Sequence, residues 1–449
     1  MARSASLSGF PELLPQERMI EQHVIDSLRS CFELHGFASI ETRAVETVEQ
    51  LLRKGEIDKE VYAVSRLQAE EGASDPSLAL HFDLTVPFSR YVVENAGYLA
   101  FPFKRYQIQK AWRGERPQEG RAREFTQADF DVVGDGTLPF LHDVEIVLLA
   151  VDALSSLPIP EFRIRVNNRK LAEGFYRGLG LEDTAGVLRN IDKLEKIGAT
   201  AVAKLLSEEL GATDTQAQAA LALAQIRSSD LGFVAQVRQL CETHGVQNEL
   251  LTEGLEELST VLSAAMNRAP GVVIADLSIA RGLDYYTGTV METELVGHEA
   301  LGSICSGGRY DALARKGNRT FPGVGLSIGV SRLVARILSQ QLATASRQVP
   351  TAVYVALTSD QDWSAAQDIA ASLRARGVPT EVAVSAEKFG KQIKFADRRG
   401  IPFVWFLQED GSSEVKDLRS GEQLPADPEN WLPPLEDRRV EVQRNLLTE

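Results

Sequence analysis

The sequence predicts a mixed α/β chain that is built from more than one domain. Short strand-like runs with turn signals dominate the chain up to about residue 134. Residues 170–268 are instead rich in Ala, Leu and Glu, with apolar residues recurring at helical spacing. After residue 350, strand and helix patterns alternate, as in a small α/β domain with a mostly parallel sheet. A length of 449 residues agrees, because a single core rarely serves so long a chain.

Composition and charge exclude several classes of protein. With 44% apolar and 25% charged residues, the chain is an ordinary globular one and not disordered, collagen-like or a coiled coil. The formal net charge of −15 argues against a protein that coats DNA regardless of sequence. Three distant cysteines make neither a disulfide framework nor a four-ligand zinc site. No apolar run reaches the roughly 18 residues of a membrane span, and no secretory signal is evident, so we expect a cytoplasmic protein.

The first half of the chain divides into six expected elements. An amphipathic helix is predicted at residues 16–37. Residues 103–112 and 124–133 are strand-like and flank a polar loop with Pro and Gly, which predicts a hairpin with a long tip. A helix at 142–155 and a strand at 162–166 follow, and the helical stretch at 170–268 is interpreted as an insertion.

The second half returns to strands before the final domain. Strands are expected at 272–275, 285–294 and 303–305, and a helix is expected at 330–338. Residues 340–348 are interpreted as a linker. The final domain is expected to hold strands at 353–357, 381–384 and 403–407, with helices at 363–376 and 388–399.

The predicted hairpin has the features of a ligand site. Residues 101–125 carry seven basic side chains against three acidic ones, and arginine suits phosphate contacts. On the return strand Gln127, Asp129 and Asp131 share one face. On the outgoing strand Arg113 and Glu115 likewise share a face. A solvated charged hairpin would show the same pattern, so the hairpin alone does not decide between the two interpretations.

Other segments repeat this polar theme. Asp83 and Thr85 are two residues apart, so in a strand they would point the same way. Residues 281–286 combine Arg281 with Tyr285 and Tyr286. Paired glycines in residues 306–311 allow close backbone approach, whereas the glycine-rich residues 323–329 match neither the dinucleotide fingerprint nor the P-loop.

These segments, in this order, resemble the histidyl-tRNA synthetases (histidine–tRNA ligases), a family of class II aminoacyl-tRNA synthetases. FKRYQIQKAWRGERPQEGRAREFTQADFDVVG is similar to class II motif 2, and GVGLSIGVSRL is similar to motif 3. ARGLDYYTG and SGGRYD resemble the two signatures peculiar to the histidine enzyme. The resemblance covers nearly the whole chain, from about residue 9 into the C-terminal domain.

The resemblance implies a role for each matching residue. Arg113, Arg281 and Arg332 would be catalytic, because they would supply positive charge to the reacting phosphates. ATP would contact Arg113, Glu115 and Arg332. The histidine substrate would contact Asp83, Thr85, Arg113, Gln127, Asp131, Arg281, Tyr285 and Tyr286. The tRNA would contact Gln118 and Arg123 in the motif 2 loop and Lys388, Lys391 and Gln392 in the C-terminal domain.

The resemblance also implies an architecture and a set of partners. The fold would be an antiparallel sheet flanked by helices, with a catalytic core at residues 1–169 and 269–340 and a helical insertion at 170–268. A linker at 341–349 would lead to an anticodon-binding-like α/β domain at 350–449. The partners would be ATP, L-histidine, tRNA(His) and a second copy in a homodimer, with Mg²⁺ as cofactor, unassigned metal ligands, and neither membrane nor DNA.

One relative with a different function shares this fold. A regulatory, non-catalytic paralogue serves the ATP phosphoribosyltransferase of histidine biosynthesis, and such proteins usually lack the C-terminal domain and the intact histidine signatures. Here the signature residues are present and about 100 residues follow Pro350, which favours the ligase.

Overall fold

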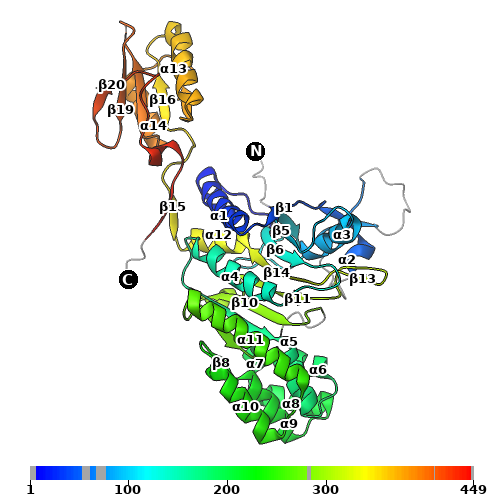
Figure 1. Ribbon diagram of the computed structural model, residues 1–449. Coiled ribbons are helices and arrows are strands. Elements are labelled where there is room, and N and C mark those ends of the chain that lie inside the picture. The colour runs from blue at the N-terminus through cyan, green and yellow to red at the C-terminus, as the bar shows by residue number, and fades with distance from the viewer. Residues whose placement is uncertain (1–6, 53–60, 67–76, 281–284, 409, 446–449) are drawn as a thin grey trace. The chain divides into compact units, whose positions relative to one another are not determined.

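The computed structural model describes residues 7–52, 61–66, 77–280, 285–408 and 410–445 (Figure 1). The chain divides into two compact units, Met1–Pro11 with Val24–Arg336, and Glu12–His23 with Ile337–Glu449. Within the described ranges, no helix has the length and apolar character that crossing a membrane requires.

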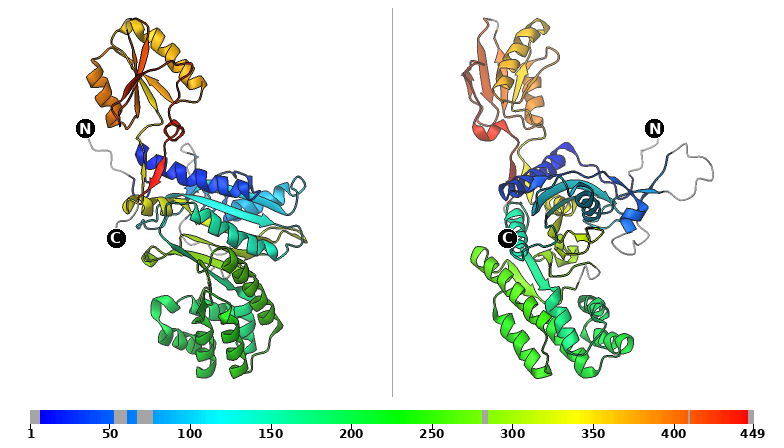
Figure 2. Two further views of the ribbon diagram at one scale, coloured as in Figure 1. Left: turned by 60° about the vertical axis from the view of Figure 1, so that its left-hand side comes forward. Right: turned by 45° about the vertical axis from the view of Figure 1, so that its right-hand side comes forward.

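A nine-stranded sheet is the centre of the first unit. Most neighbouring strands run antiparallel, and only the pairs β1–β5 and β7–β9 are parallel. The sheet confirms the expected mixed α/β class with an antiparallel core (Figure 2). In spatial order the strands are β1 (Ala38–Ser39), β5 (Phe103–Trp112), β6 (Glu124–Val133), β14 (Gly323–Gly329), β11 (Cys305–Tyr310), β10 (Thr289–Leu295), β7 (Phe162–Asn168), β9 (Val273–Asp276) and β8 (Arg227–Ser228).

The predicted hairpin forms with the expected bounds. β5 and β6 pair from Phe103 opposite Val133 to Trp112 opposite Glu124. From Thr126 onward every residue of β6 is buried, and β5 and β14 flank the strand on its two edges. The polar residues of β6 are therefore inside the protein, where each needs a hydrogen-bonding or charged partner.

Helices and smaller sheets cover the main sheet. α4 packs on β14, and its sequence is apolar on nearly all sides, as suits a buried helix. α3 carries Phe88 and Val92 into a cluster with Val133 of β6 and Phe321. The remaining elements here are α1 (Pro15–Leu34), β2 (Val45–Thr47), α2 (Val48–Leu51), β3 (Ala63–Val64), β4 (Leu78–Leu80), α3 (Thr85–Asn95), α4 (Leu141–Ser155), η2 (Glu299–Leu301), β12 (Arg315–Lys316), β13 (Arg319–Thr320) and α12 (Val330–Ser339).

Between β7 and β9 the chain forms a helical layer. α11 packs against α5 and also touches β7 and β9, which joins this layer to the main sheet. Several of its helices begin at side-chain caps, such as the Thr213–Gln216 capping box before α9. The helices are α5 (Arg169–Gly178), α6 (Thr184–Ile191), α7 (Leu194–Ile197), α8 (Ala199–Leu210), α9 (Asp214–Ala224), α10 (Gly232–His244) and α11 (Glu249–Arg268).

The second unit contains a five-stranded sheet. β17 (Thr380–Val382), β16 (Val353–Ala356) and β18 (Phe403–Leu407) are parallel, as expected, whereas β19 (Ser413–Asp417) and β20 (Gln423–Pro425) extend the sheet antiparallel. Trp405 is fully buried in its core. The other elements are η3 (Asp360–Asp362), α13 (Trp363–Ala375), α14 (Phe389–Arg398) and η4 (Leu435–Arg438).

The segment expected to be a linker is partly a strand. β15 (Ala343–Ala345) pairs with β21 (Val442–Arg444). A strand this short shows no periodicity of its own, and its partner lies about 100 residues later in the chain, so the sequence pattern did not reveal it.

Candidate active site

A pocket of about 670 Å³ opens on the main sheet of the first unit. It brings together nine of the residues expected to bind ATP or histidine, from segments that are far apart in the chain. They are Asp83, Thr85, Arg113, Glu115, Gln127, Asp131, Tyr285, Tyr286 and Arg332.

The floor of the pocket is one face of β6 and β14. Gln127, Asp129 and Asp131 lie on this face of β6, and Ser327 stands opposite Asp129 on β14. The Ser327 hydroxyl donates to Asp129 Oδ1 at 2.6 Å and accepts from Gln127 Nε2 at 2.7 Å. A chain of hydrogen bonds thus holds the polar floor in place, and the solvated-hairpin interpretation does not apply to β6.

Both carboxylate oxygens of Asp131 have partners. Arg105 Nη2 lies 2.7 Å from Asp131 Oδ2, and the Tyr310 hydroxyl donates to Oδ1 at 2.7 Å. Arg105 is fully buried, and its guanidinium lies 3.9 Å from the centre of the Phe88 ring. Burial, followed by the nearby negative charge of Asp131, raises the pKa of Tyr310 well above its ordinary value, so its hydroxyl stays protonated and donates.

Asp129 has a different environment from Asp131. Burial raises the pKa of the Asp129 carboxyl to about 7. Arg105 lowers that pKa, the negative charges of Asp131 and Asp83 raise it, and the hydrogen bond from Ser327 lowers it. Asp129 therefore changes its charge near neutral pH, unlike an ordinary aspartate.

Asp83 and Thr85 reach the pocket, but they do so from the start of a helix and not from a strand. Thr85 begins α3, and Asp83 Oδ1 accepts from the backbone N–H of Val86 at 3.1 Å. The prediction that Asp83 and Thr85 share the face of a strand is therefore wrong, although both residues line the pocket. A carboxylate next to the first turn of a helix satisfies one of its open N–H groups.

Arg113 and Arg332 lie at the motif 2 end of the pocket. Arg113 Nε donates to the carbonyl oxygen of Phe82 at 3.0 Å, and its guanidinium lies 5.1 Å from the Phe125 ring centre. Arg332 Nε donates to the Gly120 carbonyl at 3.3 Å, and Arg332 Nη1 donates to the Ser303 carbonyl. Both guanidinium groups are thus oriented by the protein beside a space that a phosphate can enter.

Two tyrosines close the other side of the pocket. The ring centres of Tyr285 and Tyr286 are 4.2 Å apart and tilted by 48°. Burial of the Tyr286 phenol, followed by the neighbouring Tyr285, raises the pKa of Tyr286 well above its ordinary value. Arg281, the other residue expected from this signature, lies outside the described residues.

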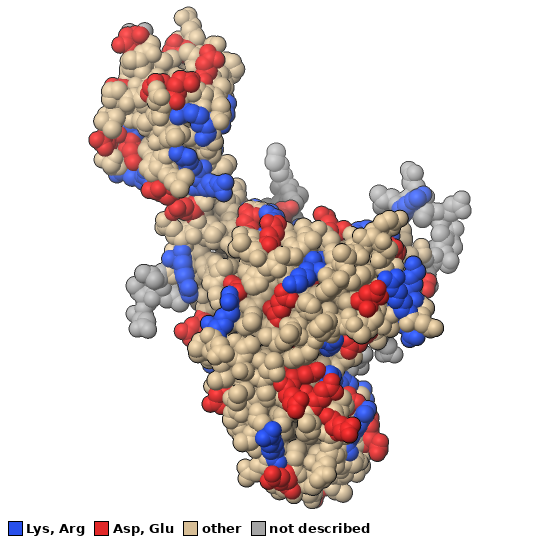
Figure 3. All heavy atoms as spheres, in the orientation of Figure 1, with Lys and Arg blue, Asp and Glu red and all other residues tan. Residues whose placement is uncertain are grey.

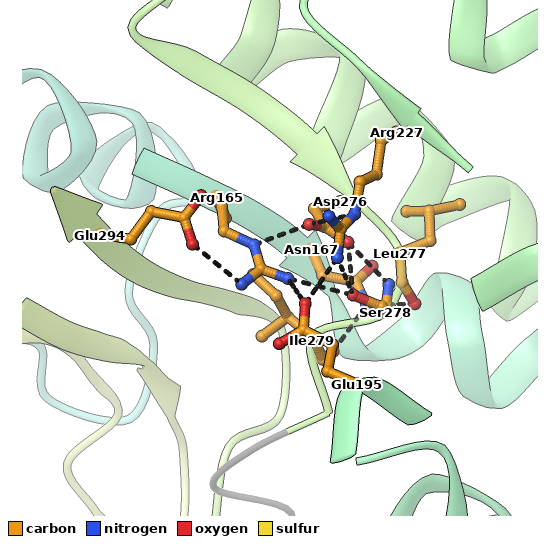
Figure 4. Close-up of polar contacts among 9 residues, drawn as sticks. All are labelled: Arg165, Asn167, Glu195, Arg227, Asp276, Leu277, Ser278, Ile279 and Glu294. Atoms are coloured by element: carbon orange, nitrogen blue, oxygen red, sulfur yellow. Dashed lines mark hydrogen bonds and ion pairs between the residues drawn. The ribbon is translucent and has the colours of Figure 1, made fainter. Parts of the chain in front are cut away.

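A network of ion pairs supports the segment that leads to this signature (Figure 4). Arg165 of β7 contacts Asp276 at 2.7 Å and Glu195 of the helical layer at 2.6 Å, and Arg227 contacts the same two carboxylates at 2.8 and 2.6 Å. Asn167 Nδ2 donates to the carbonyl of Ile279 at 2.8 Å. The network joins the sheet, the helical layer and residues 276–279 in one place.

Several basic residues of the hairpin serve the structure and not the pocket. Lys104 pairs with Glu145 and Lys110 pairs with Glu124, while Arg105 holds Asp131 inside the protein. The excess of basic residues therefore overstated the charge available to a phosphate. The hairpin pairing itself could have revealed the partner of Arg105. In a regular β5–β6 pairing without a bulge, Arg105 lies directly opposite Asp131.

The residues expected to contact tRNA are dispersed. Gln118 and Arg121 form a small backbone bridge in the hairpin tip, while Arg123 donates to the carbonyl oxygens of Glu115 at 3.2 Å and Ser8 at 3.3 Å. Neither Gln118 nor Arg123 lines the described pocket. On the face drawn in Figure 3, basic and acidic side chains are interspersed over both units.

In the second unit, Lys388 and Lys391 are exposed, and Lys391 pairs with Glu387 at 2.5 Å. Gln392 is only 2% exposed, and its amide donates to Leu357 O at 2.6 Å and accepts from Leu357 N at 2.9 Å. The expectation that Gln392 faces RNA is therefore corrected. Its buried amide fixes α14 against the end of β16, which helical spacing of polar residues could not reveal.

Sequence reasoning placed Asp129 on the polar face but assigned it no role, and it did not single out Ser327 or Tyr310. Ser327 lies within the glycine-rich residues 323–329, and Tyr310 lies within the second histidine signature. Their partners are in β6, nearly 200 residues away, so no local pattern connects them.

Comparison with known proteins places this site in context. A family model described as histidyl-tRNA synthetase matches residues 9–333, and one described as an anticodon binding domain matches residues 352–436. A histidine–tRNA ligase of Micrococcus luteus is 70% identical over 459 residues, which cover 99% of each chain.

Solved structures agree with these matches. The histidyl-tRNA synthetase of Nostoc sp. PCC 7120 has a TM-score of 0.84 at 35% identity, over 95% of this chain and 97% of that one. A Bacillus halodurans structure, described as an ATP phosphoribosyltransferase regulatory subunit/histidyl-tRNA synthetase, has a TM-score of 0.71 at 21% identity, over 88% and 96%. The latter likeness supports the fold alone.

Proposed function

This chain belongs to the histidyl-tRNA synthetase family, and on that premise we propose how its residues perform histidine–tRNA ligation in the pocket on the main sheet. Such a ligase activates L-histidine with ATP and then transfers histidine to the end of its tRNA. The observation that carries the proposal is the convergence of Asp83, Gln127, Asp131, Arg113 and Arg332 on a single pocket.

The first step needs no nucleophile from the protein. A carboxylate oxygen of histidine attacks the α-phosphorus of ATP, the bond from that phosphorus to the bridging oxygen breaks, and diphosphate leaves. Catalysis then depends on positioning and on stabilising the charge of the phosphates. Arg113 is the proposed contact of the α-phosphate and the histidine carboxylate, and Arg332 is the proposed contact of the γ-phosphate. Arg281 is proposed to act at the reacting phosphate.

The remaining ATP contact is assigned to Glu115, which lines the pocket beside Arg121 and would orient the nucleotide near its adenine end. Its carboxylate accepts hydrogen bonds, as an amino group of a base requires.

Recognition of histidine is assigned to the floor and the tyrosine pair. Asp83, Thr85 and Gln127 are proposed to hold the amino group, while Asp131, Tyr285 and Tyr286 frame the imidazole. A site that hydrogen-bonds a ring N–H rejects analogues without it by about 10⁴–10⁵. That discrimination is sufficient without a separate editing reaction.

The tRNA is proposed to contact both units. Lys388, just before α14, and Lys391 within it are exposed lysines in the domain whose family model is described as anticodon binding. Gln118 and Arg123 in the hairpin tip are the proposed contacts of the acceptor end.

Mg²⁺ is proposed to enter with ATP. Among the described residues there is no group of three or more His, Cys, Asp or Glu side chains that could hold a metal ion. Mg²⁺ is commonly held by substrate phosphates with one or two carboxylates, so these residues fit a metal brought by the nucleotide. When bound, it would supply positive charge to the phosphates.

A homodimer and a cytoplasmic location complete the proposal. The dimer follows from the family resemblance, and the cytoplasm is where an enzyme that serves translation finds its tRNA. Sedimentation of the purified protein and fractionation of cells test these two points. The regulatory paralogue is not favoured, because a histidine–tRNA ligase is 70% identical over nearly the full length and the anticodon-binding domain is present.

ATP–pyrophosphate exchange tests the proposed first step. The purified protein is given each of the twenty amino acids in turn, and exchange that only histidine stimulates is the expected result. Charging of tRNA(His) with labelled histidine then tests the second step. A folded protein that exchanges with no amino acid would contradict the ligase and favour the regulatory paralogue.

A further inference from the structure

Three aspartates line the pocket near a single buried arginine of the main sheet. The aspartates are Asp83, Asp129 and Asp131, and Arg105 is the buried cation that acts on Asp129. Arg105 forms its ion pair with Asp131, at 2.7 Å, whereas it donates only to the backbone carbonyl of Asp129, at 3.4 Å. The carboxylate of Asp131, and not that of Asp129, is therefore the one that Arg105 pairs with.

Asp129 and Asp131 differ in the partners that the protein provides for their carboxylates. Asp131 already accepts from Arg105 on one oxygen and from Tyr310 on the other. Asp129 Oδ1 accepts a hydrogen bond from the neutral Ser327 hydroxyl, and none of the described residues forms an ion pair with the Asp129 carboxylate. Its side chain is nevertheless 2% exposed and lines the pocket, so a cationic ligand in the pocket is the partner that its charge lacks.

The position of Asp129 along β6 indicates which part of the substrate it meets. The strand rises by about 3.3 Å per residue, so Asp129 lies about 7 Å from both Gln127 and Asp131. Gln127, on the amino-group side of the proposed substrate, shares the Ser327 hydroxyl with Asp129. The negative charge of Asp83 also acts on Asp129, and both carboxylates line the same pocket.

We propose that Asp129 is a binding-determining residue of this ligase, which receives the α-ammonium group of histidine together with Asp83. The proposal rests on the proposed function, because it takes histidine as the occupant of the pocket. It adds a carboxylate to the set of residues that the family resemblance assigned to the amino acid.

A change in protonation accompanies this contact. Before histidine binds, the Asp129 carboxyl has a pKa of about 7, and an arriving ammonium favours the charged carboxylate, so the proton leaves to solvent. Histidine binding therefore tightens as the pH rises through that value. The groups that act on Asp129 are Arg105 on β5, Asp131 on β6, Cys305 and Tyr310 on β11, Ser327 on β14 and Asp83 before α3.

Asp129→Asn is the variant that tests the proposal, with Asp135→Asn as its control. Asp135 is a half-exposed aspartate just beyond β6 that pairs with Arg319 outside the pocket. The Michaelis constant for histidine in ATP–pyrophosphate exchange is measured from about pH 6 to about pH 9. Ionisation of free histidine over this range affects the measurement equally for every variant, so differences between variants come from the protein. We expect Asp129→Asn to raise the constant at pH 8 about 10- to 100-fold and to remove the additional pH dependence of the wild type.

Two inhibitors then identify the group that Asp129 contacts. Histamine carries the ammonium and the imidazole, whereas imidazole-lactate has a hydroxyl in place of the ammonium. Asp129→Asn should weaken histamine and leave imidazole-lactate nearly unchanged. Equal weakening of both inhibitors would overturn the assignment to the ammonium, and so would a histidine Michaelis constant equal to that of Asp135→Asn.

Ser327→Ala keeps the test decisive if the first variant does not fold. It removes a hydrogen bond that lowers the pKa of Asp129, so the pH at which histidine binding tightens should move upward. An unmoved profile would contradict the proposal. Exchange by the wild type with histidine distinguishes failure of the proposed function from failure of this inference. If the wild type shows no exchange, the ligase is rejected. If it shows exchange and the variants are unaffected, only the role of Asp129 is rejected.

Discussion

Gly325 lies directly opposite Asp131 on the neighbouring strand, and a carboxylate oxygen of Asp131 occupies the space that a side chain at position 325 would need. A β-carbon there would stand 2.0 Å from Asp131 Oδ1 and 2.8 Å from the carbonyl oxygen of Phe130. Glycine at 325 is thus a requirement of the pocket floor, because the Asp131 oxygen in that space accepts the hydrogen bond from Tyr310.

Gly325→Ala should therefore disturb both the pocket and the fold. Displacement of Asp131 should raise the Michaelis constant for histidine at least tenfold, and the overpacking should cost about 1–3 kcal/mol of unfolding free energy. Histidine-dependent exchange and urea unfolding measure the two effects. Gly97→Ala is the control, because its new β-carbon meets nothing within 4 Å, and equal behaviour of the two variants would refute the argument.

Arg105→Met should be strongly destabilising because it leaves the carboxylates of the floor without their buried cation. Removal of one partner from a buried ion pair costs about 3–5 kcal/mol. Arg319→Met removes a half-exposed pair with Asp135, which solvent screens, and should lower the unfolding free energy far less. In urea titrations the double variant Arg105→Met/Asp131→Asn should recover part of the loss, and no recovery would show that the cost has another origin.

Arg165→Met should cost more unfolding free energy than Arg227→Met, although both arginines contact Asp276 and Glu195. The Arg165 side chain is 9% exposed and that of Arg227 is 49% exposed, so solvent screens the second arginine far more. We expect about 3 kcal/mol or more for Arg165 and about 1 kcal/mol or less for Arg227. Thermal unfolding of both variants, with the double variant for coupling, measures this, and the reverse order would contradict the network in Figure 4.

The pH dependence of stability should report the burial of Asp129. Its carboxyl has a pKa of about 7 in the folded protein against an ordinary value of 3.8. Between these values the folded state binds the extra proton, so the unfolding free energy falls as the pH rises from about 4 to about 7, by about 4 kcal/mol.

Asp129→Asn removes this contribution, so without histidine the variant should be more stable than the wild type at pH 8 and have no such advantage near pH 4. Unfolding midpoints in urea at both pH values measure the difference. If the difference in stability between the wild type and Asp129→Asn were the same at both pH values, Asp129 would not titrate as described.

Gln392→Ala and Lys388→Ala should fail in different assays. The side-chain amide of Gln392 is buried and both donates to and accepts from the backbone of Leu357. Its loss should therefore cost about 1–3 kcal/mol of unfolding free energy. Lys388 is exposed, so its loss should weaken tRNA charging several-fold and leave ATP–pyrophosphate exchange unchanged. Equal charging defects with unchanged stability would instead place Gln392 at the RNA.

Local patterns predicted the parts of the fold whose partners are near in the chain. The β5–β6 hairpin has the predicted bounds because two alternating runs flank a turn, and β18 begins and ends where its apolar run does. Asp83 and Thr85 show the limit of such patterns. A spacing of two residues suited a strand, but the helix that begins at Thr85 brings both residues to the pocket.

The order of the elements could be predicted from local patterns, and the motifs predicted the family and most of the residues around the pocket. The division of the polar residues between ligand and fold became visible only when the strands were assembled. Arg105 and Gln392 looked like candidates for phosphate or RNA and are buried structural groups, whereas Asp129 gained its significance from its surroundings. The reason is that burial and charge balance depend on strands such as β6 and β14, which lie nearly 200 residues apart and meet only in the folded sheet.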